Sequence, residues 1–291
     1  MRVAVLGAGT MGHGIAQVSA MAGHSVMLHD IEADLVEAGL ASIRENLDGG
    51  IERGKVSEAE RDTALDRIDT TTDLDVAAAN ADLVIEAIPE EMDLKQSTFT
   101  EVEAAAPQEA VLASNTSSLS VTEIASVLGR SERAVGLHFF NPPHIMGLVE
   151  VVLAEQTAEE TRQFAEEFVT GIGKTPITVA DSPGFATSRL GVALGAEAIR
   201  MLQTGVASAR DIDRAMELGY NHPMGPIELT DVVGLDVRLD VLEYLRAELG
   251  ERFKPPQLLR RKVRAGKLGR KSGEGFYRWA DGEIIDEGGM E

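Results

Sequence analysis

Cysteine is absent from the sequence of 291 residues. Its absence excludes a disulfide scaffold, a cysteine-ligated zinc site and a thiol nucleophile, and we expect no bound metal. No apolar run approaches the roughly 18–20 residues that a membrane-spanning helix needs, so we expect no membrane partner. The chain begins directly with a strand-like segment, residues 2–6, so we expect no signal peptide and a cytoplasmic location.

Positive charge is also scarce, because 27 Lys and Arg stand against 48 Asp and Glu, which gives a formal net charge of −21. Only seven of these cations are lysines. A surface this acidic repels nucleic acid, so we expect no nucleic-acid partner. The acid-rich, lysine-poor composition is typical of proteins from a salt-rich cytoplasm, where salt screens self-repulsion. An acidic protein from an ordinary cytoplasm is the alternative.

Two sequence patterns divide the chain near residue 182. Up to about residue 180, short runs of Val, Ile and Leu alternate with amphipathic stretches, which predicts parallel strands joined by helices. The expected strands are 2–6, 25–29, 82–87, 110–114, 134–139, 148–153 and 175–180. After residue 182 the strand pattern largely ends, and helices are expected at 185–204, 211–218, 226–249 and 257–265. We therefore predict an α/β domain over residues 1–182 and an all-α domain over residues 183–291.

Residues 32–67 interrupt the strand–helix alternation with two helical patterns, 35–47 and 57–67, joined by glycine-containing turns. Ser57 and Glu60 form a capping-box pattern at the start of the second helix. We predict a helical hairpin inserted in the α/β domain, which serves either as a structural flap or as an arm that contacts a ligand. In the second domain, Gly219 stands at the expected end of a helix, and the polar tail 282–291 is expected to be loose.

A glycine-rich motif follows the first expected strand and opens a helix. Gly7 permits a tight turn, Gly9 lets the backbone approach a pyrophosphate, and Gly12 allows close packing of helix and strand. The second strand is followed by Asp30, whose carboxylate would bind a ribose 2′-hydroxyl and repel a 2′-phosphate. These features predict a Rossmann-like domain that binds NAD rather than NADP, with a ligand-free structural turn as the alternative. The expected cofactor contacts are Gly7, Gly9, Thr10, Met11, Gly12 and Asp30.

His138 is the strongest candidate for a general base. It stands near the end of the apolar strand 134–139, where strands of open α/β sheets face a ligand crevice. Glu150 lies within the strand 148–153, where a carboxylate is costly to bury unless it is paired. A hairpin would bring Glu150 to His138 and stabilise the imidazolium of a base for alcohol oxidation. From the residues alone, the alternative that His138 is structural and Glu150 is unrelated to it is equally open.

Several segments resemble the L-3-hydroxyacyl-CoA dehydrogenases, most closely those of the bacterial 3-hydroxybutyryl-CoA dehydrogenase type. They are Ser-Asn-Thr-Ser-Ser at 114–118, Gly-Leu-His-Phe-Phe-Asn-Pro at 136–142, Leu-Val-Glu-Val at 148–151, Asp-Ser-Pro-Gly-Phe at 181–185 and His-Pro-Met-Gly-Pro at 222–226. The likeness extends from Arg2 to Tyr277. It implies an enzyme of fatty acid metabolism that uses NAD to oxidise (S)-3-hydroxyacyl-CoA to 3-oxoacyl-CoA and catalyses the reverse reduction.

The resemblance also implies roles for single residues. His138 would be the base for oxidation and the acid for reduction, and Glu150 would orient it. Ser117 and Asn141 would border the nicotinamide and the substrate oxygens. Further implied cofactor contacts are Glu90, Lys95 and Lys271. Implied substrate contacts are Ser117, Asn141, Ser188, which replaces an asparagine of many members, and Lys55, which with Arg53 and Arg44 is a cation of the inserted hairpin for a CoA phosphate.

The resemblance further implies a homodimer that forms through the C-terminal domain. The helices 185–204 and 226–249 are the candidate contacts, with a role of their apolar stripes in the core of the domain as the alternative. Two other functions remain open at this stage. One is an NAD-dependent dehydrogenase of a free 3-hydroxy acid or sugar acid, which activity with acetoacetyl-CoA against free acids would distinguish. The other is a non-catalytic NAD-binding protein, which would bind NADH without turnover. Related enzymes that oxidise through a cysteine thiohemiacetal are excluded by the absence of cysteine.

Overall fold

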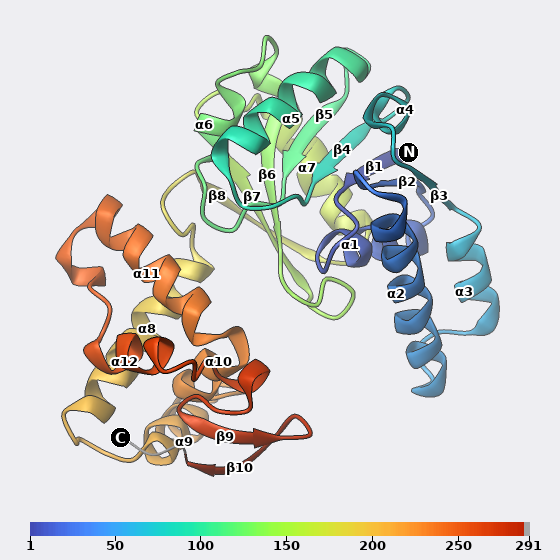
Figure 1. Cartoon of the computed structure of the whole chain (residues 1–291). Helices are drawn as coiled ribbons and strands as arrows, with labels where there is room; N and C mark the ends of the chain where they lie inside the picture. Colours follow the sequence, from blue (N-terminus) through green and yellow to red (C-terminus); the bar gives the residue numbers. More distant parts are fainter. Residues whose placement is uncertain (288–291) are drawn as a thin grey trace. The chain divides into compact units, whose positions relative to one another are not determined.

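The computed structural model describes residues 1–287, which form two compact units that divide between Ser182 and Pro183. The N-terminal unit is built on a sheet, and the C-terminal unit consists mainly of helices (Figure 1). The predicted Rossmann-like domain followed by a helical domain is confirmed. Among the described residues, no helix has both the length and the apolar character that crossing a bilayer requires.

Eight strands form the sheet of the N-terminal unit in the order β3-β2-β1-β4-β5-β6-β7-β8. The strands are β1 (Arg2–Leu6), β2 (Ser25–His29), β3 (Ile68–Thr71), β4 (Leu83–Glu86), β5 (Val111–Ser114), β6 (Ala134–Phe139), β7 (Leu148–Leu153) and β8 (Thr175–Ala180). Strands β1 to β6 are parallel and have the strand order of dinucleotide-binding sheets. Strand β7 runs antiparallel to β6, and β8 is parallel to β7.

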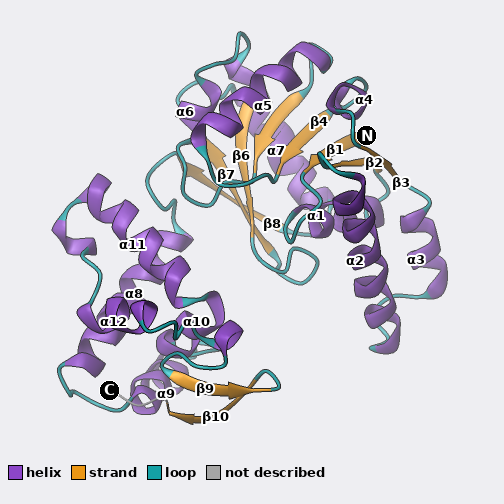
Figure 2. Ribbon diagram, in the orientation of Figure 1, coloured by secondary structure: helices purple, strands orange, loops and turns teal. Residues whose placement is uncertain are grey.

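Helices cover both faces of this sheet (Figure 2). Those on one face are α1 (Gly12–Met21), α2 (Ala33–Glu52), α3 (Glu58–Leu65) and α7 (Glu159–Gly171). Those on the other face are α4 (Leu74–Ala78), α5 (Met92–Ala105) and α6 (Val121–Ala125). Because most central strands are buried on both faces, they appear in the sequence as continuous apolar runs. A hydrophobic core lies on each face of the sheet. Both cores include side chains of β1 and β4, the strands between which the strand order reverses.

The inserted helical hairpin is present as α2 and α3, which lie side by side (Figure 1). Its second helix begins with the predicted capping box, in which the Ser57 N–H donates to Glu60 Oε2 at 2.8 Å. Two glycine-containing turns, 48–50 and 53–55, were expected between these helices; the first is wrong, because α2 continues through both glycines to Glu52, and the chain turns at the second. Gly50 lies so close to Val56 that an added Cβ would come within 2.9 Å of the valine Cγ2. This glycine therefore serves packing within the hairpin rather than a turn.

The apolar pattern of the sequence does not predict β3 or α4. Strand β3 lies at the sheet edge, and only Ile68 of its four residues is buried, so it contains no apolar run. Helix α4 has only five residues, which is too short to show helical periodicity. The side chain of Asp73 caps α4 by accepting from the N–H groups of Asp75 and Val76.

The C-terminal unit contains five α-helices and one β-hairpin in its described part. They are α8 (Thr187–Gln203), α9 (Ala209–Tyr220), α10 (Pro226–Val233), α11 (Leu235–Leu249), α12 (Gln257–Arg264), β9 (Tyr277–Ala280) and β10 (Glu283–Glu287). The hairpin corrects the expectation of an exclusively helical domain, and β10 corrects the expected loose tail over residues 283–287, whereas residues 288–291 of that tail lie outside the described residues. Tyr277 and Trp279 alternate with exposed neighbours and pack into the helical core. The turn residues Asp281 and Gly282 both have positive φ, the Asp-Gly signal of a tight hairpin.

Two helix boundaries also differ from the expectation. The predicted helix 226–249 is divided at Gly234, whose φ of +107° ends α10 before α11 begins. Helix α9 continues past Gly219 to Tyr220 and is capped by Asn221, which takes the left-handed conformation with φ +59°. Asparagine is the residue other than glycine that adopts this conformation most readily, so the helix end lies two residues later than the glycine suggests.

Candidate active site

The glycine-rich loop connects β1 to α1 at the carboxyl end of the sheet. Gly7 has φ +96°, and a Cβ added there would lie 2.6 Å from the Ala87 carbonyl oxygen. A Cβ on Gly12 would lie 1.7 Å from the Gly7 carbonyl oxygen, whereas a Cβ on Gly9 would meet nothing within 4 Å. The outer glycines are therefore required by the close packing of strand, loop and helix. Gly9 keeps the approach to the helix N-terminus open, as a bound pyrophosphate requires.

Asp30 follows β2 and joins the glycine-rich loop to it. One carboxylate oxygen accepts the Ala8 N–H at 2.7 Å, and the other accepts the Ile31 N–H at 2.8 Å. Each oxygen retains a second lone pair that can accept a ribose hydroxyl. The side chain thus has both the position and the acceptor capacity that the prediction of NAD requires, and it also holds the loop in place.

Glu90 accepts several hydrogen bonds from the loop that follows β5. Its carboxylate accepts the Thr116 hydroxyl at 2.7 Å, the Ser117 N–H at 2.9 Å and the Ser118 N–H at 3.1 Å. Burial favours the neutral form of Glu90, but the charge of Lys95 and these hydrogen bonds outweigh burial and lower its pKa. Glu90 is therefore an ionised anchor for the loop that contains Ser117.

Lys95 is 1% exposed and lies between two carboxylates. Its Nζ is 2.6 Å from Glu86 Oε1 and 3.3 Å from Glu90 Oε2. The ammonium thus compensates buried negative charge inside the N-terminal unit. Its implied direct contact with the cofactor stays a prediction. Glu86, whose part in this cluster no sequence signal indicated, lies at the last position of β4.

His138 and Glu150 form a buried pair across the antiparallel strands β6 and β7. They are direct partners in the strand register, and His138 Nδ1 lies 2.6 Å from Glu150 Oε2. The glutamate is fully buried and the histidine is 6% exposed. The Phe140 ring lies against the imidazole, with 4.5 Å between the ring centroids. This geometry is what a base supported by a carboxylate requires, because it fixes Nδ1 toward the acid.

Asn115 connects the Ser117 loop to the strand of His138. Its own N–H donates to the Glu86 carbonyl, and its side-chain oxygen accepts the Phe139 N–H at 2.9 Å. The segment 114–118 was identified by its resemblance, but no role was predicted for this asparagine. Asn141 lies two residues beyond the end of β6 and is exposed, as is Ser117. Hydrogen bonds between neighbouring strand ends thus connect the Glu90–Ser117 loop with the strands of His138 and Glu150.

Other predicted site residues lie outside this group. Lys55 is exposed in the turn between α2 and α3. Ser188 lies near the start of α8 in the C-terminal unit and is half-buried. Lys271 also belongs to the C-terminal unit, where its Nζ is 2.6 Å from Asp236 Oδ2. The roles implied for these three residues stay predictions.

A hollow of about 840 Å³ lies along α2 and the start of α1. Arg44, Arg53 and His13 are among the residues that line it. Desolvation lowers the pKa of nearby His144, and the charges of His13, Arg53 and Lys174 lower it further. Glu45, Asp48 and Glu52 line the same hollow, so its surface carries charges of both signs.

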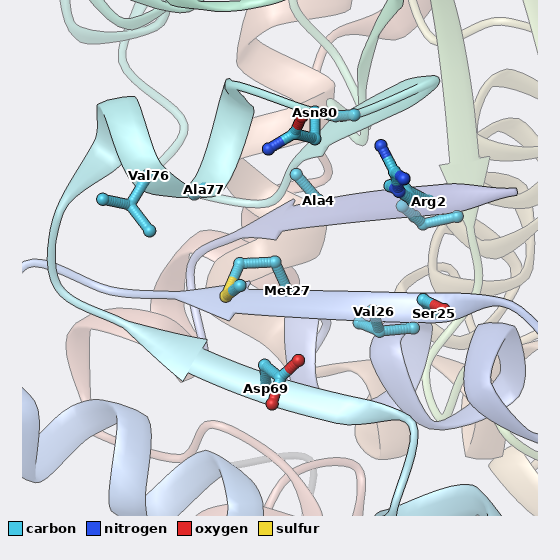
Figure 3. Close-up of a pocket in the computed structure, with 11 residues that line it drawn as sticks. Arg2, Ala4, Ser25, Val26, Met27, Asp69, Val76, Ala77 and Asn80 are labelled. Atoms are coloured by element: carbon cyan, nitrogen blue, oxygen red, sulfur yellow. The ribbon is translucent and has the colours of Figure 1, made fainter.

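A second, smaller hollow of about 380 Å³ lies over β1, β2 and β3 beside α4 (Figure 3). It is lined by mixed polar and apolar side chains, including Arg2, Met27 and Asp69, and by none of the predicted site residues. Within residues 1–287, no three acidic or histidine side chains are grouped closely enough to hold a metal ion.

Comparison with known proteins gives two family matches that together cover nearly the whole chain. Residues 2–182 match the profile described as 3-hydroxyacyl-CoA dehydrogenase, NAD binding domain, and residues 184–279 match the C-terminal domain of that enzyme. A probable 3-hydroxybutyryl-CoA dehydrogenase of Deinococcus radiodurans is 44% identical over 280 residues, which cover 96% of this chain and 100% of the relative. A 3-hydroxybutyryl-CoA dehydrogenase of Clostridioides difficile is 40% identical, with coverage of 95% and 99%.

Solved structures give the same result. The crystal structure of (S)-3-hydroxybutyryl-CoA dehydrogenase from Ralstonia eutropha superposes with a TM-score of 0.92 at 42% sequence identity. The superposition covers 96% of this chain and 99% of the other chain. Sequence and fold thus agree over both units.

Proposed function

This chain belongs to the 3-hydroxyacyl-CoA dehydrogenase family, and we propose that it oxidises (S)-3-hydroxyacyl-CoA to 3-oxoacyl-CoA with NAD and catalyses the reverse reduction. The buried pair of His138 and Glu150, at 2.6 Å in a unit with the NAD-binding fold, carries this proposal. The relatives that are named for 3-hydroxybutyryl-CoA make the four-carbon acyl group the first substrate to test.

In the proposed mechanism, His138 removes the proton of the C3 hydroxyl. Because Nδ1 faces Glu150, Nε2 is the nitrogen that takes this proton, and the carboxylate stabilises the resulting imidazolium. The chemistry that NAD supplies when bound is acceptance of the hydride from C3. In the reverse direction, the protonated His138 returns its proton to the C3 oxygen as the alcohol forms.

Ser117 and Asn141 are proposed to border the reacting groups. Both are exposed and lie on loops at the carboxyl ends of β5 and β6, beside the strand that carries His138. Strand ends of this kind form the ligand crevice of open α/β sheets. Glu90 supports this arrangement, because it fixes the Ser117 backbone by a hydrogen bond of 2.9 Å.

An acyl-CoA substrate, unlike a free acid, would need cations on the inserted hairpin. CoA carries phosphates, and a chain with a net charge of −21 repels anions unless local cations bind them. Arg44 and Arg53 line the hollow along α2, which makes them candidates for a CoA phosphate beside the Lys55 predicted from the sequence. Because Glu45, Asp48 and Glu52 line the same hollow, the phosphate would be bound by individual cations rather than by a basic surface.

The decisive experiment compares substrates under identical conditions. We expect NADH oxidation with acetoacetyl-CoA to exceed that with acetoacetate by orders of magnitude in kcat/KM. Preference for the free acid would favour a dehydrogenase of free 3-hydroxy acids. Tight NADH binding without turnover of either substrate would favour a non-catalytic protein. The assay extends from low to molar KCl, because the acidic composition predicts a salt-adapted cytoplasmic protein whose self-repulsion is screened by salt.

We also propose that the protein is a homodimer through its C-terminal unit. Apolar side chains are exposed on three neighbouring helices, α8, α10 and α11, and Leu190 of α8 is 71% exposed. Exposed apolar groups gathered in this way mark interaction surfaces. Light scattering is expected to give twice the mass of one chain for the wild type and a shift toward monomer for Leu190→Lys. A monomeric wild type at micromolar concentration would contradict the proposal.

A further inference from the structure

Glu86 is a buried carboxylate to which no step of the proposed reaction has been assigned. It is the last residue of β4, and its side chain is 1% exposed. Three donors from three segments satisfy it: the Ile88 N–H at 2.8 Å, the Lys95 ammonium at 2.6 Å and the Ser114 hydroxyl at 2.7 Å. Glu86 therefore fastens its own loop, helix α5 and the end of β5 to one point.

Two paths lead from Glu86 to the loop that contains Ser117. In the first, Lys95 bridges Glu86 and Glu90, and Glu90 accepts the N–H groups of residues 117 and 118. In the second, Ser114 donates its hydroxyl to Glu86 and accepts the Thr116 N–H at 3.2 Å. The position of the loop that contains Ser117 thus depends on Glu86 in two ways, through Lys95 and Glu90 and through Ser114.

A third path leads to the strand of the proposed base from the backbone carbonyl of Glu86, whose position the anchored side chain helps to fix. The Glu86 carbonyl accepts the Asn115 N–H at 2.8 Å, and the Asn115 side chain accepts the Phe139 N–H at 2.9 Å. Phe139 directly follows His138. Movement of the β4 end would therefore be transmitted to Ser117 and to the strand of His138 together.

Charge balance makes this cluster sensitive to the loss of Glu86. Lys95 is fully buried, and its partners in the cluster are Glu86 at 2.6 Å and Glu90 at 3.3 Å. A buried ammonium that loses one carboxylate must draw closer to the other or rearrange. The carboxylate that remains is Glu90, the same group that holds the Ser117 loop.

We propose that Glu86 is a positioning residue for the reaction, which sets the geometry of the 116–118 loop and of the His138 strand without touching substrate or cofactor. The proposal rests on the proposed function for its catalytic part. A residue that served folding alone would change stability and leave the turnover of the folded enzyme unchanged, so the two roles are separable.

The test uses Glu86→Gln in the full-length protein, which keeps the shape of the side chain and removes its charge. We expect kcat for acetoacetyl-CoA reduction to fall about 10- to 100-fold, the range for a misplaced catalytic group. The rate is measured at saturating NADH, and the Kd of NADH is measured by fluorescence, because Glu90 and Lys95 are predicted cofactor contacts in the same cluster. Hydrogen exchange is expected to become faster at the amides of residues 116–118 and of Phe139.

Glu103→Gln is the matched control. Glu103 is a carboxylate of the same unit that accepts the Gly129 and Arg130 N–H groups at 2.9 and 2.8 Å, away from the Ser117 loop. It is expected to leave both kcat and exchange at 116–118 unchanged. Ser114→Ala removes one donor to Glu86 with a smaller perturbation, and it provides the same readouts if Glu86→Gln does not fold.

Each outcome decides the proposal. Slower turnover together with faster exchange at 116–118, in Glu86→Gln or in Ser114→Ala, supports it. Wild-type kcat per folded molecule, or unchanged exchange at these amides, overturns it, even if the thermal midpoint falls. If the wild type does not turn over acetoacetyl-CoA, the proposed function fails, and unchanged exchange in Glu86→Gln would still overturn the positioning of the loop.

Discussion

His138 and Glu150 are paired both by backbone and by side chain. They face each other in the β6–β7 register, and His138 Nδ1 lies 2.6 Å from Glu150 Oε2. A base formed in this way depends on both partners. We expect His138→Gln and Glu150→Gln each to lower kcat about 100-fold or more, within the usual range for a lost acid–base group. Steady-state kinetics with acetoacetyl-CoA and NADH check this expectation.

His24→Gln is a suitable control for this prediction, because His24 directly precedes β2 and lies against Phe168, with 5.7 Å between the ring centroids. It is expected to retain wild-type kcat even if the protein is less stable. A rate like that of the wild type in His138→Gln would show that the assigned base is wrong.

Asp30 is expected to determine the choice between NAD and NADP. Its carboxylate also accepts the Ala8 N–H at 2.7 Å, so Asp30→Asn is the better test than Asp30→Ala, because the amide oxygen can keep this bond. The variant no longer repels a 2′-phosphate. We expect the ratio of kcat/KM for NADH to that for NADPH to fall about tenfold, which corresponds to ~1.4 kcal/mol. An unchanged ratio would place the ribose contact elsewhere.

Glu90 is expected to make the stability of the protein depend on pH. Its pKa is lowered from the ordinary 4.5, since Lys95 and the hydrogen bonds outweigh burial. A carboxylate with a lowered folded-state pKa stabilises the fold above its unfolded pKa, and this contribution is lost as pH falls through the lowered value. Glu90→Gln should therefore reduce the thermal midpoint at pH 7 by about 2–4 °C and by less below pH ~4.

Calorimetry of both proteins across this pH range tests the prediction. Glu101→Gln, at an exposed position on helix α5, which begins two residues after Glu90, is the control and should follow the wild type at every pH. A difference between wild type and Glu90→Gln that stays constant with pH would mean that charge at Glu90 contributes nothing.

Arg53 is expected to contribute to binding of the CoA part of the substrate. It lines the hollow along α2 together with Arg44. Arg53→Gln should raise KM for acetoacetyl-CoA several-fold with little change in kcat, because a contact remote from the reacting atoms affects ground state and transition state alike. Arg2→Gln, on the separate hollow over β1–β3, should leave KM unchanged. Equal KM values for Arg53→Gln and wild type would exclude Arg53 as a CoA contact.

Asp231 is expected to hold the C-terminal hairpin against the helices. This fully buried carboxylate accepts the Phe276 N–H at 2.8 Å, the Tyr277 N–H at 2.9 Å and the Trp279 indole N–H at 2.9 Å. Asp231→Asn places an amide donor against these donors, at a cost of about 1–3 kcal/mol. Because Trp279 is the only tryptophan, its fluorescence emission reports the hairpin directly and should shift to the red.

Urea unfolding followed by this fluorescence gives the loss of stability. Asp240→Asn is the control, because Asp240 is exposed on α11 and should tolerate the change. An emission spectrum and a midpoint like those of the wild type in Asp231→Asn would contradict the anchoring role.

The sequence by itself determined the features that depend on local pattern. Continuous apolar runs predicted seven of the eight strands of the large sheet, because strands buried on both faces need apolar side chains throughout. The glycine spacing predicted the dinucleotide loop, because Gly7 and Gly12 stand where any Cβ would collide with backbone. The edge strand β3 and the hairpin that contains Tyr277 and Trp279 were not predicted, since short elements show little periodicity.

Only the tertiary structure decided which polar side chains meet. The sequence of the loop between β6 and β7 does not fix how these two strands align. It therefore permitted the pairing of His138 with Glu150 but did not require it, since a shift of one residue would turn Glu150 to the other face of the sheet. The cluster of Glu86, Lys95 and Ser114 brings together the end of β4, helix α5 and the end of β5. The distances between these three side chains depend on the order and alignment of the parallel strands. Local sequence does not specify that order or alignment.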